Sequence, residues 1–336
     1  MPPAMEMSPL PAPLAALAAA QPHLFWPLVL ALGLALLMRG ADHFTAAAET
    51  VGRAAGLSPF VVGVIIVAFG TSLPELVASV LAVVRDASEI VMGNVLGSNI
   101  ANLGLVLGLG AVVAGRLEIR RHVGTLDLPL LAAATLLATL TALDGRVVRA
   151  EAALLLFALA VYVHLGLRAR DDDAFDVSVD AGRPAPPRIA RAVLVLVVSG
   201  VVIWLAAEAT VRAVIEIALL FAITTETIAA TAVALGTSLP EVAVTLTAAR
   251  RGRAEMAAGN IIGSNVFNLL AVAGVSGLVG PLAVPGALVT LALPTMVGIT
   301  LVAMIMLATR VVSRWEGWFL LTIYGWFLAA VTGLLD

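Results

Sequence analysis

The sequence contains no cysteine and no lysine, and few of its residues are charged. Of its 336 residues, 12% are charged and 61% are hydrophobic, whereas about 25% of an average soluble domain is charged. The absence of cysteine excludes disulfide and thiolate chemistry. The shortage of charge excludes an ordinary soluble domain, and nothing in the sequence predicts a nucleotide-binding domain or a nucleic-acid partner.

Apolar runs recur along the whole chain, and many approach the roughly 20 residues that cross a bilayer. They do not alternate apolar with polar residues, which excludes a transmembrane β-barrel. Helices satisfy their own backbone groups in lipid, so we predict an all-α polytopic membrane protein with ten transmembrane helices. The expected spans lie at about residues 25–51, 60–84, 90–113, 126–142, 151–167, 192–220, 224–249, 256–279, 287–308 and 315–334.

The sequence Gly-Thr-Ser-Leu-Pro-Glu occurs twice, at residues 70–75 and again 166 residues later. Between residues 70–104 and 236–270, 16 of 35 positions are identical without a gap, which indicates an internal repeat. The offset covers five expected spans, an odd number, so the second copy enters the membrane from the opposite side. We therefore predict two inverted five-helix repeats with a site near the bilayer midplane. The predicted division is a tail at 1–23, a first repeat at 24–168, a cytoplasmic linker at 169–190 and a second repeat at 191–336.

Arginine is unevenly distributed among the predicted loops, and the positive-inside rule places the rich set in the cytoplasm. Both termini are then extracytoplasmic, in a multi-pass protein of the cell membrane. Residues 1–23 are rich in Ala and Pro and lack the basic region of a signal peptide. We expect a poorly ordered tail, with an interfacial helix at Leu14–Ala20 as the alternative. The acidic linker can be a solvated connection, as charge blocks usually are, or a calcium-binding cluster.

Each repeat places a glutamate directly after a proline, inside apolar sequence. Pro74 and Pro240 lack an N–H and disturb the preceding turn, so the carbonyls around Ala68 and Ala234 can leave the helix and line a cavity. Every polar group near them is an oxygen donor, which suits a hard cation, and two carboxylates neutralise one divalent ion. Ca²⁺ is favoured over Mg²⁺, which resists dehydration. The side-chain oxygens belong to Thr71, Ser72, Glu75, Ser98, Asn102, Thr237, Ser238, Glu241, Ser264 and Asn268.

The paired GTSLPE and GNxxGSNxxN motifs resemble the two alpha repeats of the cation/calcium exchanger superfamily, and the chain is most similar to its bacterial calcium/sodium antiporters. The resemblance covers residues 40–110 and 206–276 and implies a secondary antiporter rather than an enzyme, without a cofactor. It also implies that the first and sixth spans slide over a fixed core. Carried onto this sequence, the family's cation ligands fall on the ten side chains given above and on the carbonyls of Ala68 and Ala234.

This chain departs from the family pattern at Asn268, where many sodium/calcium exchangers have aspartate. The site is less acidic as a result, so Ca²⁺/H⁺ exchange stays beside Ca²⁺/Na⁺ exchange as an alternative. An intramembrane enzyme and a passive cation channel are alternatives of other classes. Interhelical hydrogen bonding is the other interpretation of Asn102 and Asn268, and the sequence leaves the oligomeric state open.

Overall fold

A computed structural model describes residues 12–57, 61–84, 86, 88–119, 126–168, 186–220 and 238–333. These residues form helices joined by short connections, with two small strand pairs. Segments labelled η are π-helical turns, in which each carbonyl bonds the amide five residues on. Of the expected span at 224–249, the part before residue 238 lies outside the described residues.

Helices lie at the positions where the sequence predicts spans. In the first half they are α1 (Ala12–Ala20), α2 (Pro22–Ala54), η1 (Val62–Val67), α4 (Ala68–Thr71), α5 (Leu73–Val84), α6 (Glu89–Ala101), η2 (Asn102–Val106), α7 (Leu107–Ala114), α8 (Asp127–Ala142) and α9 (Arg149–Arg168). In the second half they are α11 (Pro186–Leu220), α13 (Leu239–Arg250), α14 (Ala254–Phe267), η3 (Asn268–Val272), α15 (Ala273–Val279), η4 (Leu288–Ala292), α16 (Leu293–Ala308) and α17 (Arg314–Val331).

Six helical runs of the described chain are long and apolar enough to cross a membrane, and one bent pair would make a seventh. The helical, multi-pass class predicted from the sequence is therefore confirmed. α8 is apolar but shorter. The six runs are Pro22–Ala54, Glu89–Ala114, Arg149–Gly166, Arg188–Thr210, Ala254–Val279 and Leu288–Ala308.

The segment before the first long helix differs from the expected irregular tail. α1 occupies residues 12–20, close to the alternative helix at Leu14–Ala20, and α2 already begins at Pro22. The alanine-rich sequence explains the helix, because alanine has the highest helix propensity. Ala18 is buried, whereas Leu14 and Leu17 are exposed.

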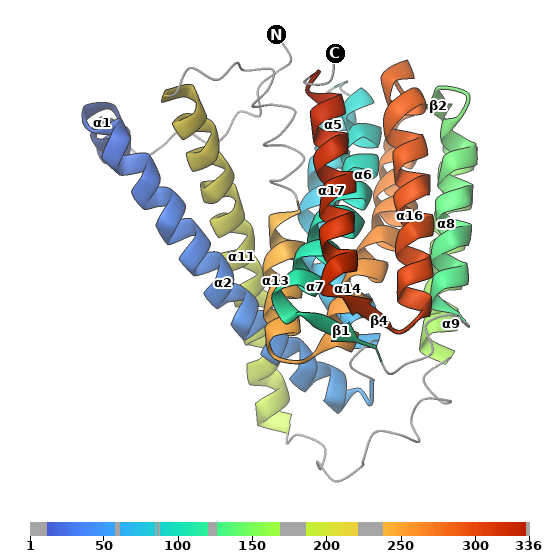
Figure 1. Ribbon diagram of the computed structural model, residues 1–336, viewed down its shortest axis with the longest axis horizontal. Coiled ribbons are helices and arrows are strands. Elements are labelled where there is room, and N and C mark those ends of the chain that lie inside the picture. Colours follow the sequence, from blue (N-terminus) through green and yellow to red (C-terminus); the bar gives the residue numbers. More distant parts are fainter. Residues whose placement is uncertain are drawn as a thin grey trace.

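The helices form a buried centre and an exposed flank (Figure 1). In their most apolar windows, the runs Glu89–Ala114 and Ala254–Val279 are 78% and 83% buried. The corresponding windows of α2 and α11 are only 33% and 22% buried. α2 and α11 pack against each other at one side of the molecule. Their outward side chains, such as Leu28 and Leu194, are apolar and exposed, as lipid-facing residues are.

Two antiparallel strand pairs join the halves of the chain. β1 (Arg116–Glu118) pairs with β4 (Val311–Ser313), and β2 (Arg146–Val147) pairs with β3 (Leu282–Ala283). β1 and β4 lie at one end of the helices and β2 at the other (Figure 1). The offset of 166 residues carries Arg116 of β1 onto Leu282 of β3, and Val147 of β2 onto Ser313 of β4. The repeat therefore relates the pair of β1 and β4 to the pair of β3 and β2.

Candidate cation-binding site

The first GTSLPE copy lies at a break in a membrane helix. η1 and α4 run to Thr71, α5 continues after Ser72, and the two arms meet at a bend of 47°. Pro74 explains the break, because it has no N–H to offer the carbonyl four residues earlier. Ser238 in the second copy has nearly the same backbone angles as Ser72 (φ −87°, ψ 0° against φ −92°, ψ 5°).

The structure corrects the expectation that the carbonyl of Ala68 leaves the helix. This oxygen accepts a hydrogen bond from the backbone N–H of Ser72 at 3.0 Å, so it stays in the helical ladder. The reason is positional: Pro74 deprives the carbonyl of Gly70 of its partner, not that of Ala68. Ala234 and Thr237, which the sequence also predicts as ligands, lie outside the described residues.

Glu75 and Glu241 are each only 1% exposed. The hydroxyl of Ser72 donates a hydrogen bond to Oε1 of Glu241 at 3.1 Å, which joins the two copies of the motif directly. Neither oxygen of Glu75, nor Oε2 of Glu241, has a hydrogen-bond partner among the described residues. A buried carboxylate without partners is strongly unfavourable, so these oxygens must bind either a cation or a proton.

The predicted amide and hydroxyl ligands of α6 and α14 are also buried. Ser98, Asn102, Ser264 and Asn268 are at most 3% exposed. The π-helical turns η2 and η3 begin at Asn102 and Asn268 respectively, and such turns often occur at functional sites. Within the described part of the chain, these acceptor atoms have no hydrogen-bond partner: Oδ1 of Asn102, Oδ1 of Asn268, Oγ of Ser264 and Oγ of Ser238.

The helices that carry these groups pack across the two halves. α13, which begins with the second motif and carries Glu241, packs against η2 and its Asn102. In the same way α5, which carries Glu75, packs against η3 and its Asn268. Each glutamate helix therefore contacts the asparagine-bearing turn of the other half. The structure thus brings oxygen donors from both halves to one buried region.

Close approach of the two halves depends on glycine. A Cβ atom on Gly263 of α14 would lie 2.7 Å from the carbonyl oxygen of Val64 and 2.8 Å from Cβ of Ala68. A Cβ on Gly63 would collide with the carbonyl of Met256. Gly259 and Gly263 stand four residues apart, the small-xxx-small spacing that permits close helix approach, and the structure shows such an approach at Gly263. A Cβ on Gly97 would meet nothing within 4 Å among the described residues.

The oxygen set suits a hard cation. It contains carboxylate, amide and hydroxyl oxygens without nitrogen or sulfur, the ligand types that Ca²⁺ and Na⁺ accept and that Zn²⁺ does not favour. No cluster of three or more His, Cys, Asp or Glu side chains occurs in the described ranges. Any cation site among the described residues therefore relies on two carboxylates supplemented by neutral oxygens.

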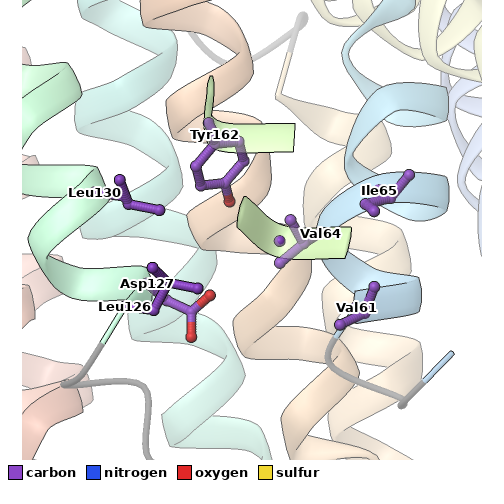
Figure 2. A pocket seen from close by; sticks show the side chains of 8 residues that line it. Val61, Val64, Ile65, Leu126, Asp127, Leu130 and Tyr162 are labelled. Atoms are coloured by element: carbon purple, nitrogen blue, oxygen red, sulfur yellow. The ribbon is translucent and has the colours of Figure 1, made fainter. Parts of the chain in front are cut away.

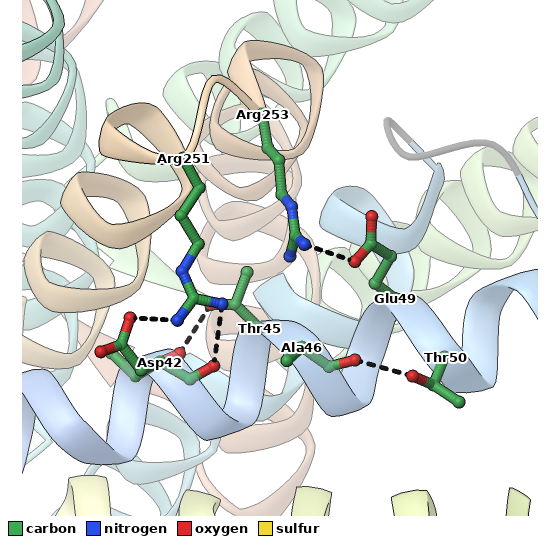
Figure 3. A network of polar contacts seen from close by, with 8 residues as sticks. Asp42, Thr45, Ala46, Glu49, Thr50, Arg251 and Arg253 are labelled. Carbon is green, nitrogen blue, oxygen red and sulfur yellow. Dashed lines mark hydrogen bonds and ion pairs between the residues drawn. The ribbon is translucent and has the colours of Figure 1, made fainter. Parts of the chain in front are cut away.

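Two ion pairs that the sequence did not predict join α2 to the loop between α13 and α14 (Figure 3). Arg251 and Arg253, in the loop between α13 and α14, bind Asp42 and Glu49 of α2, each at 2.7 Å. The sequence did contain one indication that Arg251 has a role, because the equivalent position of the first repeat is also an arginine, Arg85.

A small pocket lies away from the repeated motifs (Figure 2). Apolar side chains of η1 and α8 form most of its wall, together with the hydroxyl-bearing Tyr162 of α9. Asp127, which is 5% exposed, reaches it from the first turn of α8. The repeat offset carries Asp127 onto Leu293. This carboxylate therefore has no counterpart in the second half and lies outside the twofold arrangement.

Comparison with known proteins identifies relatives that match most of the chain. The family model described as sodium/calcium exchanger protein matches twice, over residues 25–167 and 191–333. The sodium/calcium exchanger MaX1 of Methanosarcina acetivorans is 33% identical, over 90% of this chain and 97% of its own. The inner membrane protein YrbG of Escherichia coli is 33% identical, over 75% and 79%. A solved structure of the sodium-calcium exchanger NCX_Mj superposes with a TM-score of 0.78 at 28% identity, covering 91% of this chain and 98% of that one.

Proposed function

Because the chain belongs to the sodium/calcium exchanger protein family, a family of multi-pass membrane antiporters and not of enzymes, we propose that it exchanges Ca²⁺ for Na⁺ across the cell membrane. The names of its relatives support these ions. MaX1 is a sodium/calcium exchanger, and NCX_Mj has been solved after soaking with Na⁺, with Ca²⁺ and with Sr²⁺.

One observation carries the proposal: two buried glutamates and several neutral oxygens from both halves have acceptor atoms without partners among the described residues. A divalent cation is the ligand that such a set lacks. It neutralises two carboxylates and accepts about six to eight oxygens in flexible geometry. The proposed ligands are Thr71, Ser72, Glu75, Ser98, Asn102, Thr237, Ser238, Glu241, Ser264 and Asn268, with the carbonyls of Ala68 and Ala234.

Exchange follows from competition for the same oxygens. Either Ca²⁺ or a set of monovalent ions neutralises the carboxylates, whereas the empty site keeps charges that are costly in a low-dielectric region. The loaded forms are therefore the ones that change their exposure from one side of the membrane to the other. This is alternating access, driven by an ion gradient.

We further propose that the halves are inverted repeats of five spans each, ten in all. The two family matches are 166 residues apart, as are the two motifs, and the same offset exchanges the two strand pairs. Residues 24–168 and 191–336 would be the repeats, with residues 169–190 as a cytoplasmic linker. The arginine-rich loops next to β1 and β4 would face the cytoplasm. Both termini would be extracytoplasmic, since α1 and the C-terminal end of α17 lie at the opposite end of the helices (Figure 1).

One residue, Asn268, supports H⁺ as a second candidate for the counter-ion. Asn268 stands where many exchangers of the family have aspartate, so the site holds two carboxylates rather than three. A lower negative charge favours fewer bound monovalent ions, and Ca²⁺/H⁺ exchange is the second candidate.

The test is ⁴⁵Ca²⁺ uptake into proteoliposomes loaded with Na⁺, K⁺ or buffered acid. Uptake that requires Na⁺ inside supports the proposal, and uptake that requires acid inside supports the second candidate. Calcium flux without any counter-ion gradient would indicate a channel and contradict exchange. Empty liposomes and the Glu241→Gln variant are the controls for leakage.

A further inference from the structure

Asn260 connects three helices at the edge of the proposed site. It is 0% exposed, and its Nδ2 donates a hydrogen bond to the hydroxyl of Thr245 at 2.9 Å. Its Oδ1 accepts from the hydroxyl of Thr71 at 3.4 Å. Thr245 lies on α13, Asn260 on α14, and Thr71 at the end of α4 in the other half. The amide therefore links a residue of the second half to a proposed ligand of the first.

Asn94 makes the equivalent bond through its NH₂ group in the first half, but its oxygen accepts from its own helix rather than from the other half. Its Nδ2 donates to the hydroxyl of Ser79 at 3.1 Å, and its Oδ1 accepts from the hydroxyl of Ser98 at 3.5 Å. The repeat offset carries Ser79 onto Thr245 and Asn94 onto Asn260. An equivalent hydrogen bond in both halves indicates a shared role rather than an accident of packing.

The anchoring hydroxyls are tied to the glutamates by helix geometry. Ser79 follows Glu75 by four residues, and Thr245 follows Glu241 by four residues, so each pair lies on one face of its helix. The hydrogen bond from the asparagine NH₂ group to this hydroxyl therefore fixes the helix that carries each glutamate against α6 or α14. It also fixes which end of the amide faces the site, since the NH₂ group is already engaged.

A hydroxyl can bind a cation only if its hydrogen points elsewhere, because it has one donor and two lone pairs. The Thr71 hydroxyl lies within hydrogen-bond distance of the carbonyls of Val67 at 3.1 Å and Ala68 at 3.3 Å and of Oδ1 of Asn260, and it also interacts with the Glu241 carboxylate. The first three are the acceptors within 3.5 Å. Of these only Asn260 belongs to the other half. When it takes the hydrogen, the carbonyl of Ala68 keeps a lone pair for the ion.

We infer that Asn94 and Asn260 are positioning residues for the cation, which orient the hydroxyls of Ser98 and Thr71 through amides anchored on Ser79 and Thr245. This inference rests on the proposed function. It assigns roles to four residues outside the proposed ligand set. It also makes the geometry of the first-half ligand Thr71 depend on α13 and α14 of the second half.

The test is Ca²⁺ titration of the purified full-length protein by isothermal calorimetry. Thr245→Val removes the anchoring hydroxyl without changing shape or charge. Calcium affinity is expected to fall about two- to tenfold, the span of one net hydrogen bond. Thr245→Ser restores a hydroxyl and should bind within about twofold of the wild type. Thr247→Val is the matched control, because Thr247 is equally buried on α13 and its hydroxyl bonds no described residue.

A double-mutant cycle separates positioning from general loosening. If Thr245 acts through the amide, Thr245→Val should have little further effect in an Asn260→Ala background. Unchanged affinity in Thr245→Val, equal losses in Thr247→Val, or additive losses in the cycle would each overturn the inference. If Thr245→Val does not fold, Ser79→Ala makes the same test through Asn94. A wild type that binds no Ca²⁺ at all would instead overturn the proposed function.

Discussion

Glu75 and Glu241 occupy equivalent positions but have different surroundings in this structure. Glu241 accepts a hydrogen bond from Ser72, whereas neither oxygen of Glu75 has a partner among the described residues. Identical residues in two related repeats therefore need not contribute equally in one state. A cation would reduce this inequality, because it can draw on both carboxylates at once.

Replacing either carboxylate by an amide tests the charge that the proposed site requires. Glu75→Gln and Glu241→Gln keep the side-chain shape and remove one negative charge, so Ca²⁺ transport is expected to be lost. Their unfolding temperature without calcium should not fall, because a buried charge without full pairing is removed. Saturating Ca²⁺ should stabilise the wild type, by about 2.7 kcal/mol at a hundredfold excess over Kd, and should not stabilise the variants.

Glu118→Gln provides the control, because Glu118 is an exposed residue paired with Arg116 in β1. It should transport and respond to calcium as the wild type does. Normal ⁴⁵Ca²⁺ uptake by either Glu75→Gln or Glu241→Gln would show that the ligand assignment is wrong.

Asn268 tests whether the counter-ion depends on a third carboxylate. Asn268→Asp adds one negative charge to a buried oxygen set, which favours bound monovalent cations. We expect the dependence of Ca²⁺ uptake on internal Na⁺ to strengthen several-fold, as measured by uptake at a series of Na⁺ loads. Asn102→Asp, with the same change at the equivalent position, shows whether the location of the charge matters. An unchanged sodium dependence in Asn268→Asp would contradict the idea.

At the scale of elements, the contact between α14 and the broken helix depends on a missing side chain. Gly263→Ala would force Cβ against the carbonyl of Val64 and Cβ of Ala68, and overpacking of this kind costs about 1–3 kcal/mol. Because η1 and α4 lead directly to Thr71, Gly263→Ala should displace a proposed ligand. The loss of transport should therefore exceed the loss expected from the lower stability alone. Flux in proteoliposomes and thermal unfolding measure the two effects.

Gly298→Ala on α16 is the matched control, because a Cβ there meets nothing within 4 Å of the described structure. It should transport normally and be neutral or slightly more stable. If Gly263→Ala behaves in the same way, the tight contact has no role in holding the proposed ligands.

The sequence predicted the helical class, the positions of the helices and the break at Pro74, because each depends on local features. Hydrophobic run length and the missing N–H of proline are visible in one stretch of chain. The expected departure of the Ala68 carbonyl from the helical ladder was wrong, because the effect of proline was assigned to the wrong turn. The π-helical turns at Asn102 and Asn268 and the strand pairs could not be predicted, since they depend on packing between distant segments.

The candidate site was predictable to a similar extent. Repetition identified the oxygen donors, and the structure shows that those within the described ranges are buried. The hydrogen bond between Ser72 and Glu241 could not be predicted, since it joins residues 169 positions apart. The anchors Ser79 and Thr245 were missed because hydroxyls on apolar helices are common and the repeat shows serine in one copy and threonine in the other.

At the scale of the whole molecule, α2 and α11 pack against the central helices through apolar side chains, and α2 is also held by two ion pairs to the loop between α13 and α14 (Figure 3). Their side chains are 37% and 40% exposed for Arg251 and Asp42, and 27% and 23% exposed for Arg253 and Glu49. Pairs that are exposed to this degree contribute only about 0–1 kcal/mol each. They can therefore be broken within a transport cycle.

If α2 and α11 slide over the centre, as the family resemblance implies, breaking one ion pair should alter rate rather than affinity. Arg251→Ala is expected to change the maximal Ca²⁺ flux by up to about fivefold, with the half-saturating Ca²⁺ concentration unchanged. Arg116→Ala, which removes an exposed pair within β1, is the control. A changed calcium affinity in Arg251→Ala would place this pair in the binding site instead.

The inverted arrangement of the two halves can be tested in the intact cell, and the absence of cysteine makes the native chain a ready background. Asp144 and Arg310 are exposed and 166 residues apart, so they are repeat-equivalent. Inverted repeats place such positions on opposite sides of the membrane, whereas parallel repeats would place them on the same side. With a membrane-impermeant maleimide, Asp144→Cys should label from outside and Arg310→Cys only after permeabilisation. This direction follows from the arginine-rich loops. Labelling of both from one side would contradict the inverted repeat, and with it the meeting of Glu75 and Glu241 midway through the bilayer.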